Sequence, residues 1–153
     1  MKKYTIILLL IISLLGCKCE GTSFTTSKVE NLTNYNVTIK SYKDGVLDTR
    51  ITSIEKKGLK IIGETGGRTK SSSISMYFFM ADSIVVEFDG AKKAVHYGYG
   101  GKLGKNPNAI VVTSSRSLYN DKSYVFKTLI DDKCFLETEF SYIFTEQDFL
   151  NAR

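Results

Sequence analysis

Short segments in which apolar and polar residues alternate follow one another along this chain. A two-residue period of this kind is typical of β-strands that bury one face. In the segment 35–42, Val37 and Ile39 alternate with Thr38 and Lys40. The same pattern, or a short apolar run bounded by turn residues, predicts strands at 46–54, 59–62, 74–80, 83–88, 92–99, 110–113, 124–130 and 134–144.

Two Asp-Gly dipeptides, Asp44-Gly45 and Asp89-Gly90, separate neighbouring strand segments and predict tight hairpin turns. Thr145 precedes a short terminal segment, with Asp148 three residues later, and this spacing resembles a capping box that begins a helix. No long segment shows the 3.6-residue period of helices. We therefore expect an all-β fold, an antiparallel β-sandwich of the immunoglobulin-like or transthyretin-like kind with a short C-terminal helix. A closed barrel is the alternative.

The chain begins with the pattern of a secretory leader. Lys2 and Lys3 precede an apolar run over residues 5–15, and Gly16 is the small residue expected before a cleavage point. A membrane-spanning helix needs about 20 apolar residues, and this run is shorter. We therefore predict a signal peptide at 1–16, a polar N-terminus and tether at 17–27 and a β-sandwich domain at 28–153.

The end of the leader, Leu14-Leu15-Gly16-Cys17, resembles the lipobox of bacterial lipoproteins. The resemblance implies that Cys17 is acylated after cleavage, and that it anchors the protein in a membrane of the bacterial cell envelope, for which we expect the outer membrane. Two anchoring signals are needed for stable attachment, and a di- or triacylated Cys17 supplies them. Cys19 is the weaker alternative because Lys18 before it is neither small nor apolar.

The chain is also similar to the small lipoproteins of Bacteroidetes. Three stretches carry this likeness, namely 81–90, 117–124 and 142–149. They form a hairpin, a loop and a capped chain end, and none contains a catalytic motif. The resemblance implies lipid anchoring and a β-sandwich, and it implies no activity.

The net charge of the chain and its distribution limit the kinds of partner that we expect. Without residues 1–16 the chain has 19 basic and 16 acidic residues, a net charge of +3, which together with an envelope location argues against nucleic-acid binding. Residues 88–122 carry a net +4 and residues 123–153 a net −3. Two solvated faces explain this pattern. A basic loop region that meets an anionic partner is the other interpretation.

The loop 98–108 is the candidate binding site. It is long for a hairpin connection, and its four glycines permit unusual backbone angles. The side chains expected to contact an anionic glycan, a lipid headgroup or an acidic protein are Tyr97, Tyr99, Lys102 and Lys105. A solvated loop that binds nothing is the alternative.

No catalytic or metal-binding motif is recognisable. The chain has a single histidine, His96, which we expect to be solvated on a polar strand face, and one histidine cannot build a His-rich metal site. Cys19 and Cys134 are expected to be free thiols, although an oxidising envelope would allow them to pair. We therefore expect no cofactor and no enzymatic activity, although an envelope enzyme is kept as a third hypothesis. The leading prediction is a binding domain for a protein or glycan partner. The alternative is an inhibitor or immunity-type lipoprotein that neutralises a toxin or hydrolase.

Overall fold

The computed structural model describes residues 20–74, 80–98 and 109–153. Within these ranges the chain is mostly β-strand in two sheets with one short C-terminal helix, so the prediction of an all-β, sandwich-like fold is confirmed. The predicted leader, Cys17, Tyr99, Lys102, Lys105 and most of the predicted strand 74–80 lie outside the described residues.

The first sheet is built on two long strands from opposite ends of the chain. β1 (Thr22–Asn31) and β10 (Phe135–Phe144) run parallel over their whole length. β5 (Leu59–Gly67) pairs antiparallel with β1, and β9 (Val125–Asp131) pairs antiparallel with β10. The strand order is β5-β1-β10-β9. The central pair therefore joins segments more than a hundred residues apart in the sequence.

The second sheet is centred on β2 (Val37–Lys43), β6 (Ser83–Phe88) and β7 (Lys92–Tyr97), which pair antiparallel. Its remaining strands are short: β3 (Val46–Leu47) and β4 (Thr52–Ile54) pair with β2, and β8 (Ile110–Val111) pairs parallel with β7. Both sheets are thus mixed rather than purely antiparallel. Alternation predicts which residues share a face, but it carries no information on the direction of the neighbouring strand.

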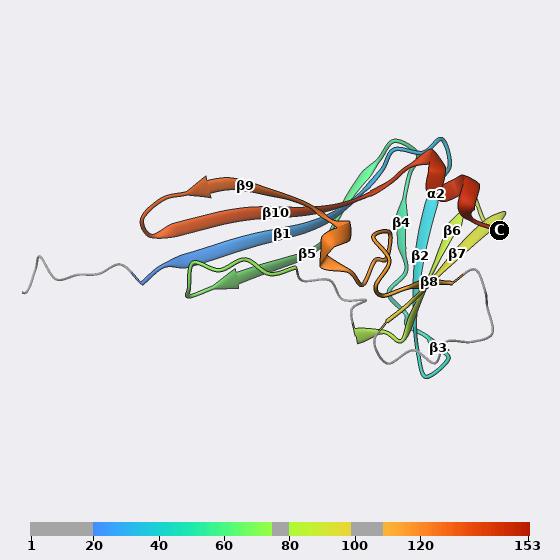
Figure 1. The fold of residues 1–153 in the computed structure, drawn as a ribbon, viewed down its shortest axis with the longest axis horizontal. Coiled ribbons are helices and arrows are strands. Elements are labelled where there is room, and N and C mark those ends of the chain that lie inside the picture. The colour runs from blue at the N-terminus through green and yellow to red at the C-terminus, as the bar shows by residue number, and fades with distance from the viewer. Residues whose placement is uncertain (1–19, 75–79, 99–108) are drawn as a thin grey trace, which may run out of the picture.

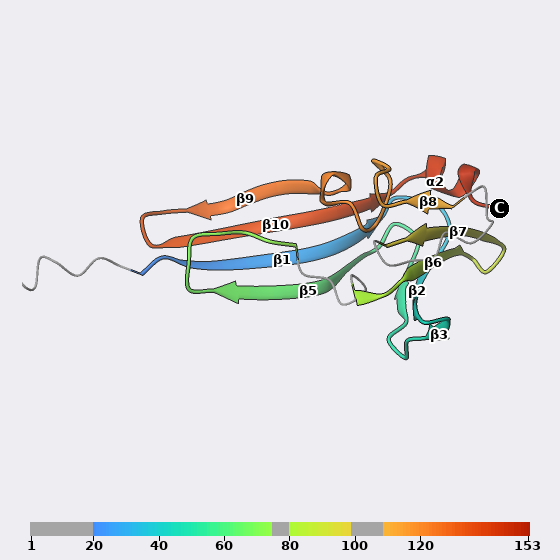
Figure 2. The ribbon, with the colours of Figure 1, turned by 60° about the horizontal axis from the view of Figure 1, so that its bottom comes forward.

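The first sheet extends well past the second. In both views β9, β10, β1 and β5 run together to one side, whereas the second sheet and the helix gather around the other end (Figure 1, Figure 2). The core lies where the sheets overlap. Val29 and Tyr142 from the first sheet are buried with Ile39 and Val86 from the second. The Phe144 ring meets Phe88 of the other sheet edge-on, with ring centroids 5.9 Å apart, a favourable aromatic geometry.

The N-terminal boundary of the domain differs from the prediction. Residues 22–27, which their polar composition assigned to the tether, are the first half of β1. Ser23, Thr25 and Ser27 point to one face and are buried, and the Thr25 and Thr138 hydroxyls lie 2.9 Å apart in a hydrogen bond. The buried face of this half of β1 is therefore made of small hydroxyl side chains, which an apolar-polar pattern does not reveal. The domain therefore begins at Thr22.

The turn and helix predictions are confirmed. Asp44 and Asp89 have positive φ angles of 51° and 48°, and each is followed by a glycine with positive φ. The helix α2 (Glu146–Asn151) begins after Thr145, whose backbone N–H and hydroxyl both donate to the Asp148 carboxylate. A short 3₁₀ helix, η2 (Asp121–Ser123), precedes β9. No helix among the described residues is both long and apolar enough to span a membrane.

The expectation of a free thiol at Cys134 is wrong, because this residue is disulfide-bonded. The chain's other cysteines, Cys17 and Cys19, both precede the described residues. Cys134 lies in the turn between β9 and β10, and its carbonyl accepts a hydrogen bond of 2.8 Å from the backbone N–H of Thr22. The parallel pairing of β1 and β10 thus brings the start of the domain next to Cys134.

Candidate functional site

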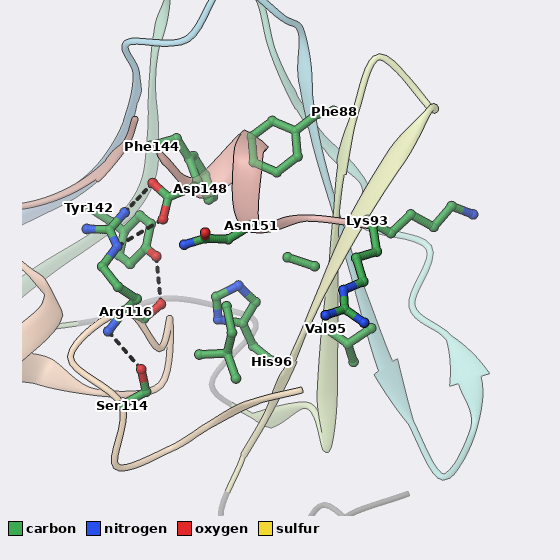
Figure 3. Close-up of a pocket in the computed structure, with 13 residues that line it drawn as sticks. Phe88, Lys93, Val95, His96, Ser114, Arg116, Tyr142, Phe144, Asp148 and Asn151 are labelled. Atoms are coloured by element: carbon green, nitrogen blue, oxygen red, sulfur yellow. Dashed lines mark hydrogen bonds and ion pairs between the residues drawn. The ribbon is translucent and has the colours of Figure 1, made fainter. Parts of the chain in front are cut away.

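A cavity of about 360 Å³ lies between β7, the segment 110–116, the end of β10 and helix α2 (Figure 3). We call it the α2 cavity; its walls are formed by Phe88, Lys93, Ala94, Val95, His96, Ile110, Ser114, Arg116, Tyr142, Phe144, Asp148, Asn151 and Arg153. Its volume is within the range of small-molecule sites, which are concave and combine apolar walls with a few polar groups.

His96 lies at the base of this cavity and is 1% exposed. The prediction of a solvated histidine is therefore wrong, and the register of the β6–β7 hairpin explains why. Phe88 pairs with Lys92, so the connecting loop has three residues and His96 stands opposite the fully buried Ile84. Directly paired residues point to the same face of a sheet. His96 consequently shares the core face of β6.

The hydrogen bonding of His96 determines which nitrogen carries its proton. The backbone N–H of Leu118 donates to Nδ1 over 3.1 Å. A backbone amide can only donate, so Nδ1 must be the unprotonated acceptor and Nε2 must carry the hydrogen of the neutral ring. Among the described residues, Nε2 has no hydrogen-bond partner in the protein. The ring therefore offers one N–H donor to the cavity.

Burial also determines the charge of His96. Removal from water lowers its pKa from 6.5 to about 3. The charge of Asp148 opposes this shift by a smaller amount, and the charge of Arg116 adds to it. The imidazole is therefore neutral at neutral pH. It is a fixed donor, and it is a poor proton acceptor.

An ion pair forms the opposite wall. Arg116 binds Asp148 through Nε and Nη2, with 3.0 Å between Nε and Oδ1, and Nη2 also donates to the carbonyl of Ile143 over 2.8 Å (Figure 3). Asp148 additionally accepts from the backbone N–H and the hydroxyl of Thr145. The carboxylate is thus fully engaged in joining α2 to the segment that carries Arg116.

Buried tyrosines hold that segment in place. The Tyr142 hydroxyl donates to the carbonyl of Arg116 over 2.8 Å, and the Tyr124 hydroxyl donates to the carbonyl of Leu118 over 2.6 Å. Both side chains are buried, and burial raises the pKa of each phenol, so both remain protonated donors. These bonds position the Leu118 amide that orients His96.

The cavity contains the three residue types of a serine hydrolase, Ser114, His96 and Asp148, but not their arrangement. In a catalytic triad the aspartate accepts from Nδ1–H and Nε2 accepts the proton of the serine. Here Nδ1 accepts from a backbone amide, Nε2 carries the hydrogen, and Asp148 is bound by Arg116 and Thr145. His96 in this state cannot deprotonate a nucleophile. No group of three or more metal-ligating side chains is found within the described ranges either.

The sequence-predicted binding loop and this cavity do not coincide. Tyr97 is next to His96 on β7 and points to the other face of the sheet, and it does not line the cavity. Tyr99, Lys102 and Lys105, like Cys17, are outside the described residues. Arg116, Asn151 and Arg153 were not predicted as site residues, because Arg116 meets the C-terminal segment that carries the other two only in the folded protein. The signal for a buried His96 was its place opposite Ile84 when 83–88 and 92–97 pair as a hairpin.

No family model, no curated protein and no solved structure matches this chain.

Proposed function

We propose that this protein is a lipid-anchored cell-envelope protein with a non-enzymatic domain that binds its partner through the α2 cavity. The observation that carries the proposal is the cavity itself, whose base is a neutral histidine held as a donor by the Leu118 amide. A site built for acid–base chemistry needs a group with a pKa near the working pH. Burial moves His96 far below that range, so the arrangement favours binding over catalysis.

The shape of the molecule suits an anchored protein. β1 begins at the far tip of the first sheet, and α2 lies at the opposite end of the molecule (Figure 1). Ten residues of extended strand span about 33 Å, since each residue advances about 3.3 Å. A lipid on Cys17 attaches close to the tip, so the sheet acts as a spacer. The cavity then faces away from the membrane, toward components of the envelope.

The anchor also assigns the disulfide. An acylated Cys17 has no thiol to pair, which leaves Cys19 as the partner of Cys134. The cross-link then closes the tip of the first sheet beside the tether. A short, covalently held tether limits the orientations that the domain can adopt above the membrane.

The anchor is tested by replacing Cys17 with serine. We expect Cys17→Ser to take up no labelled fatty acid and to accumulate as an unprocessed or soluble form, whereas wild type labels and fractionates with membranes. A Cys17→Ser protein that labels like wild type would contradict the anchor.

The binding site is tested by filling the cavity from helix α2. Asn151 lines the cavity, whereas its neighbour Leu150 is 62% exposed and does not. Asn151→Trp should lose the envelope glycan or protein that cross-links to wild type, and Leu150→Trp should retain it. Equal cross-linking by the two variants, or no cross-linked component with wild type, would refute the cavity as the binding site.

A further inference from the structure

We propose that the α2 cavity binds a small organic carboxylate. The proposal rests on the proposed binding function of the same cavity and adds the chemistry of the ligand. Hydrogen-bond donors that face the cavity, a positive balance of charge around it and its apolar walls support this ligand class.

Donor groups without acceptors converge on the cavity. His96 is 1% exposed, and its Nε2–H has no partner among the described residues. The Asn151 oxygen accepts from Gln147 Nε2 over 2.9 Å, and no hydrogen bond from its own NH₂ occurs in the described part of the chain. Figure 3 shows the Asn151 amide between Arg116 and His96. A ligand that accepts hydrogen bonds satisfies the buried Nε2–H of His96, because buried polar groups in proteins are nearly always paired, and it meets the exposed NH₂ of Asn151 at the cavity wall.

The charge of the cavity is positive. Arg116 is balanced by Asp148, whose oxygens are all occupied by Arg116 and Thr145. Lys93 points away from the cavity in Figure 3, and its ammonium is 3.2 Å from Glu87. That leaves Arg153, whose side chain has no ion pair with any described residue. A guanidinium is a planar donor that matches a carboxylate.

The remaining walls exclude a bare inorganic anion as the natural ligand. Val95 and Ile110 are partly buried apolar side chains on neighbouring strands, and the buried rings of Phe88, Tyr142 and Phe144 also line the cavity. A ligand that fills about 360 Å³ against such walls needs an organic body beside its anionic group. An aromatic acid and an acidic sugar both meet this description, and their shared chemistry is the carboxylate.

The experiment uses the single histidine of the chain as a reporter. The mature, full-length protein in detergent micelles is titrated with sodium benzoate and sodium D-glucuronate, and with the uncharged counterparts benzamide and D-glucose. Binding is read from the His96 Nε2–H signal in ¹⁵N NMR spectra and from calorimetry. We expect at least one carboxylate to shift the signal and to bind at least 10-fold more tightly than its neutral counterpart. The two carboxylates distinguish an apolar body from a sugar.

Arg153→Gln should weaken carboxylate binding about 10-fold. Arg68→Gln is the matched control, since Arg68 is exposed just after β5, away from the cavity, and should bind like wild type. Three results would overturn the proposal that the ligand is a carboxylate: equal binding of the acid and its neutral counterpart, equal effects of the two arginine variants, or an unshifted His96 signal with every probe. Because the cross-linking of Asn151→Trp is measured separately, the binding function can survive that result.

Discussion

At the scale of single residues, two fully buried polar side chains organise this protein. His96 faces the cavity, and Asn31 is at the end of β1, where the chain crosses from one sheet to the other. Asn31 satisfies the backbone groups around it, whereas His96 accepts from the Leu118 amide and its Nε2–H has no partner among the described residues. Buried polar groups with complete hydrogen bonding specify one arrangement of the chain, because any other leaves donors or acceptors unpaired.

His96 makes stability depend on pH in the acidic range. Its pKa is lowered to about 3 in the folded protein, so between pH 6.5 and 3 only the unfolded chain takes up the proton. The free energy of unfolding therefore falls as the pH falls, by about 1.4 kcal/mol per pH unit.

The test is His96→Asn, in which the Asn oxygen can still accept from Leu118. Between pH 6.5 and 5.0, we expect the free energy of unfolding, measured with urea, to fall by about 2 kcal/mol more for wild type than for the variant. The carboxylates of the protein titrate in both, so they cancel in this difference. Parallel pH profiles for the two proteins would mean that His96 is protonated in the folded state.

Asn31 should be among the most sensitive positions in the chain. Its NH₂ donates to the carbonyls of Tyr35 and Glu55 over 2.8 and 2.9 Å, and its oxygen accepts from the backbone and hydroxyl of Thr33. Asn31→Ala leaves these groups unpaired and should cost about 3 kcal/mol. Asn34→Ala, which loses one exposed bond to Glu146, should cost under about 1 kcal/mol in the same unfolding assay.

At the scale of elements, both outer strands of the first sheet are protected against further pairing. β9 is exposed along its whole length, and four of its apolar side chains are more than 40% exposed. The register of β9 against β10 is interrupted by a bulge, and so is that of β5 against β1. Bulges bend an edge strand and disturb its row of hydrogen-bonding groups, which disfavours edge-to-edge association.

The β6–β7 hairpin depends on a glycine in the left-handed region. Gly90 has φ of +70° and no heavy atom within 4 Å of an added Cβ, so Gly90→Ala should destabilise by backbone strain alone, by about 1 kcal/mol. Gly66→Ala is the control, because Gly66 lies in β5 without positive φ and its nearest contact is 3.9 Å away. We expect thermal unfolding to show a lower Tm for the first variant and little change for the second.

At the scale of the whole molecule, long-range connections hold the extended sheet together. β1 and β10 pair in parallel, and Cys134 at the tip of this pair is disulfide-bonded. Much of the first sheet extends beyond the two-sheet core (Figure 2). The strand ladder and the cross-link therefore stabilise the part of the sheet that has no second sheet against it.

Removing the disulfide should destabilise the whole domain. Both other cysteines lie near the start of the chain, so the bond closes a loop of more than about 100 residues, and its loss should cost about 2–5 kcal/mol. Urea unfolding of the mature protein in detergent measures this with Cys134→Ser. Reductant should lower the free energy of unfolding of wild type to that of Cys134→Ser, and it should leave the free energy of unfolding of the variant unchanged. If the variant is as stable as oxidised wild type, the hydrogen bonds between the strands hold the sheet together without the disulfide.

Local chemistry determined much of the fold from the sequence alone. The Asp-Gly turns were predictable because these two residues tolerate positive φ, and the core face of β6 was predictable because Ile84, Val86 and Phe88 recur at every second position with Ser83 and Glu87 on the other face. The start of α2 was predictable from Thr145 and Asp148, which interact within one helical turn. In each case the deciding contacts lie within a few residues.

Tertiary structure decided the rest, because the deciding contacts join residues that are distant in the sequence. The polar composition of Ser23, Thr25 and Ser27 predicted a linker. These residues form a strand because they pair with β10, which is more than a hundred residues away in the sequence. The apolar residues Val95 and Tyr97 predicted that His96 lies on the solvated face, but pairing with β6 places His96 opposite Ile84 and so on the core face. Arg116, Asp148 and Asn151 form one cavity with it only after both sheets and the helix have packed, so no local pattern could indicate that site.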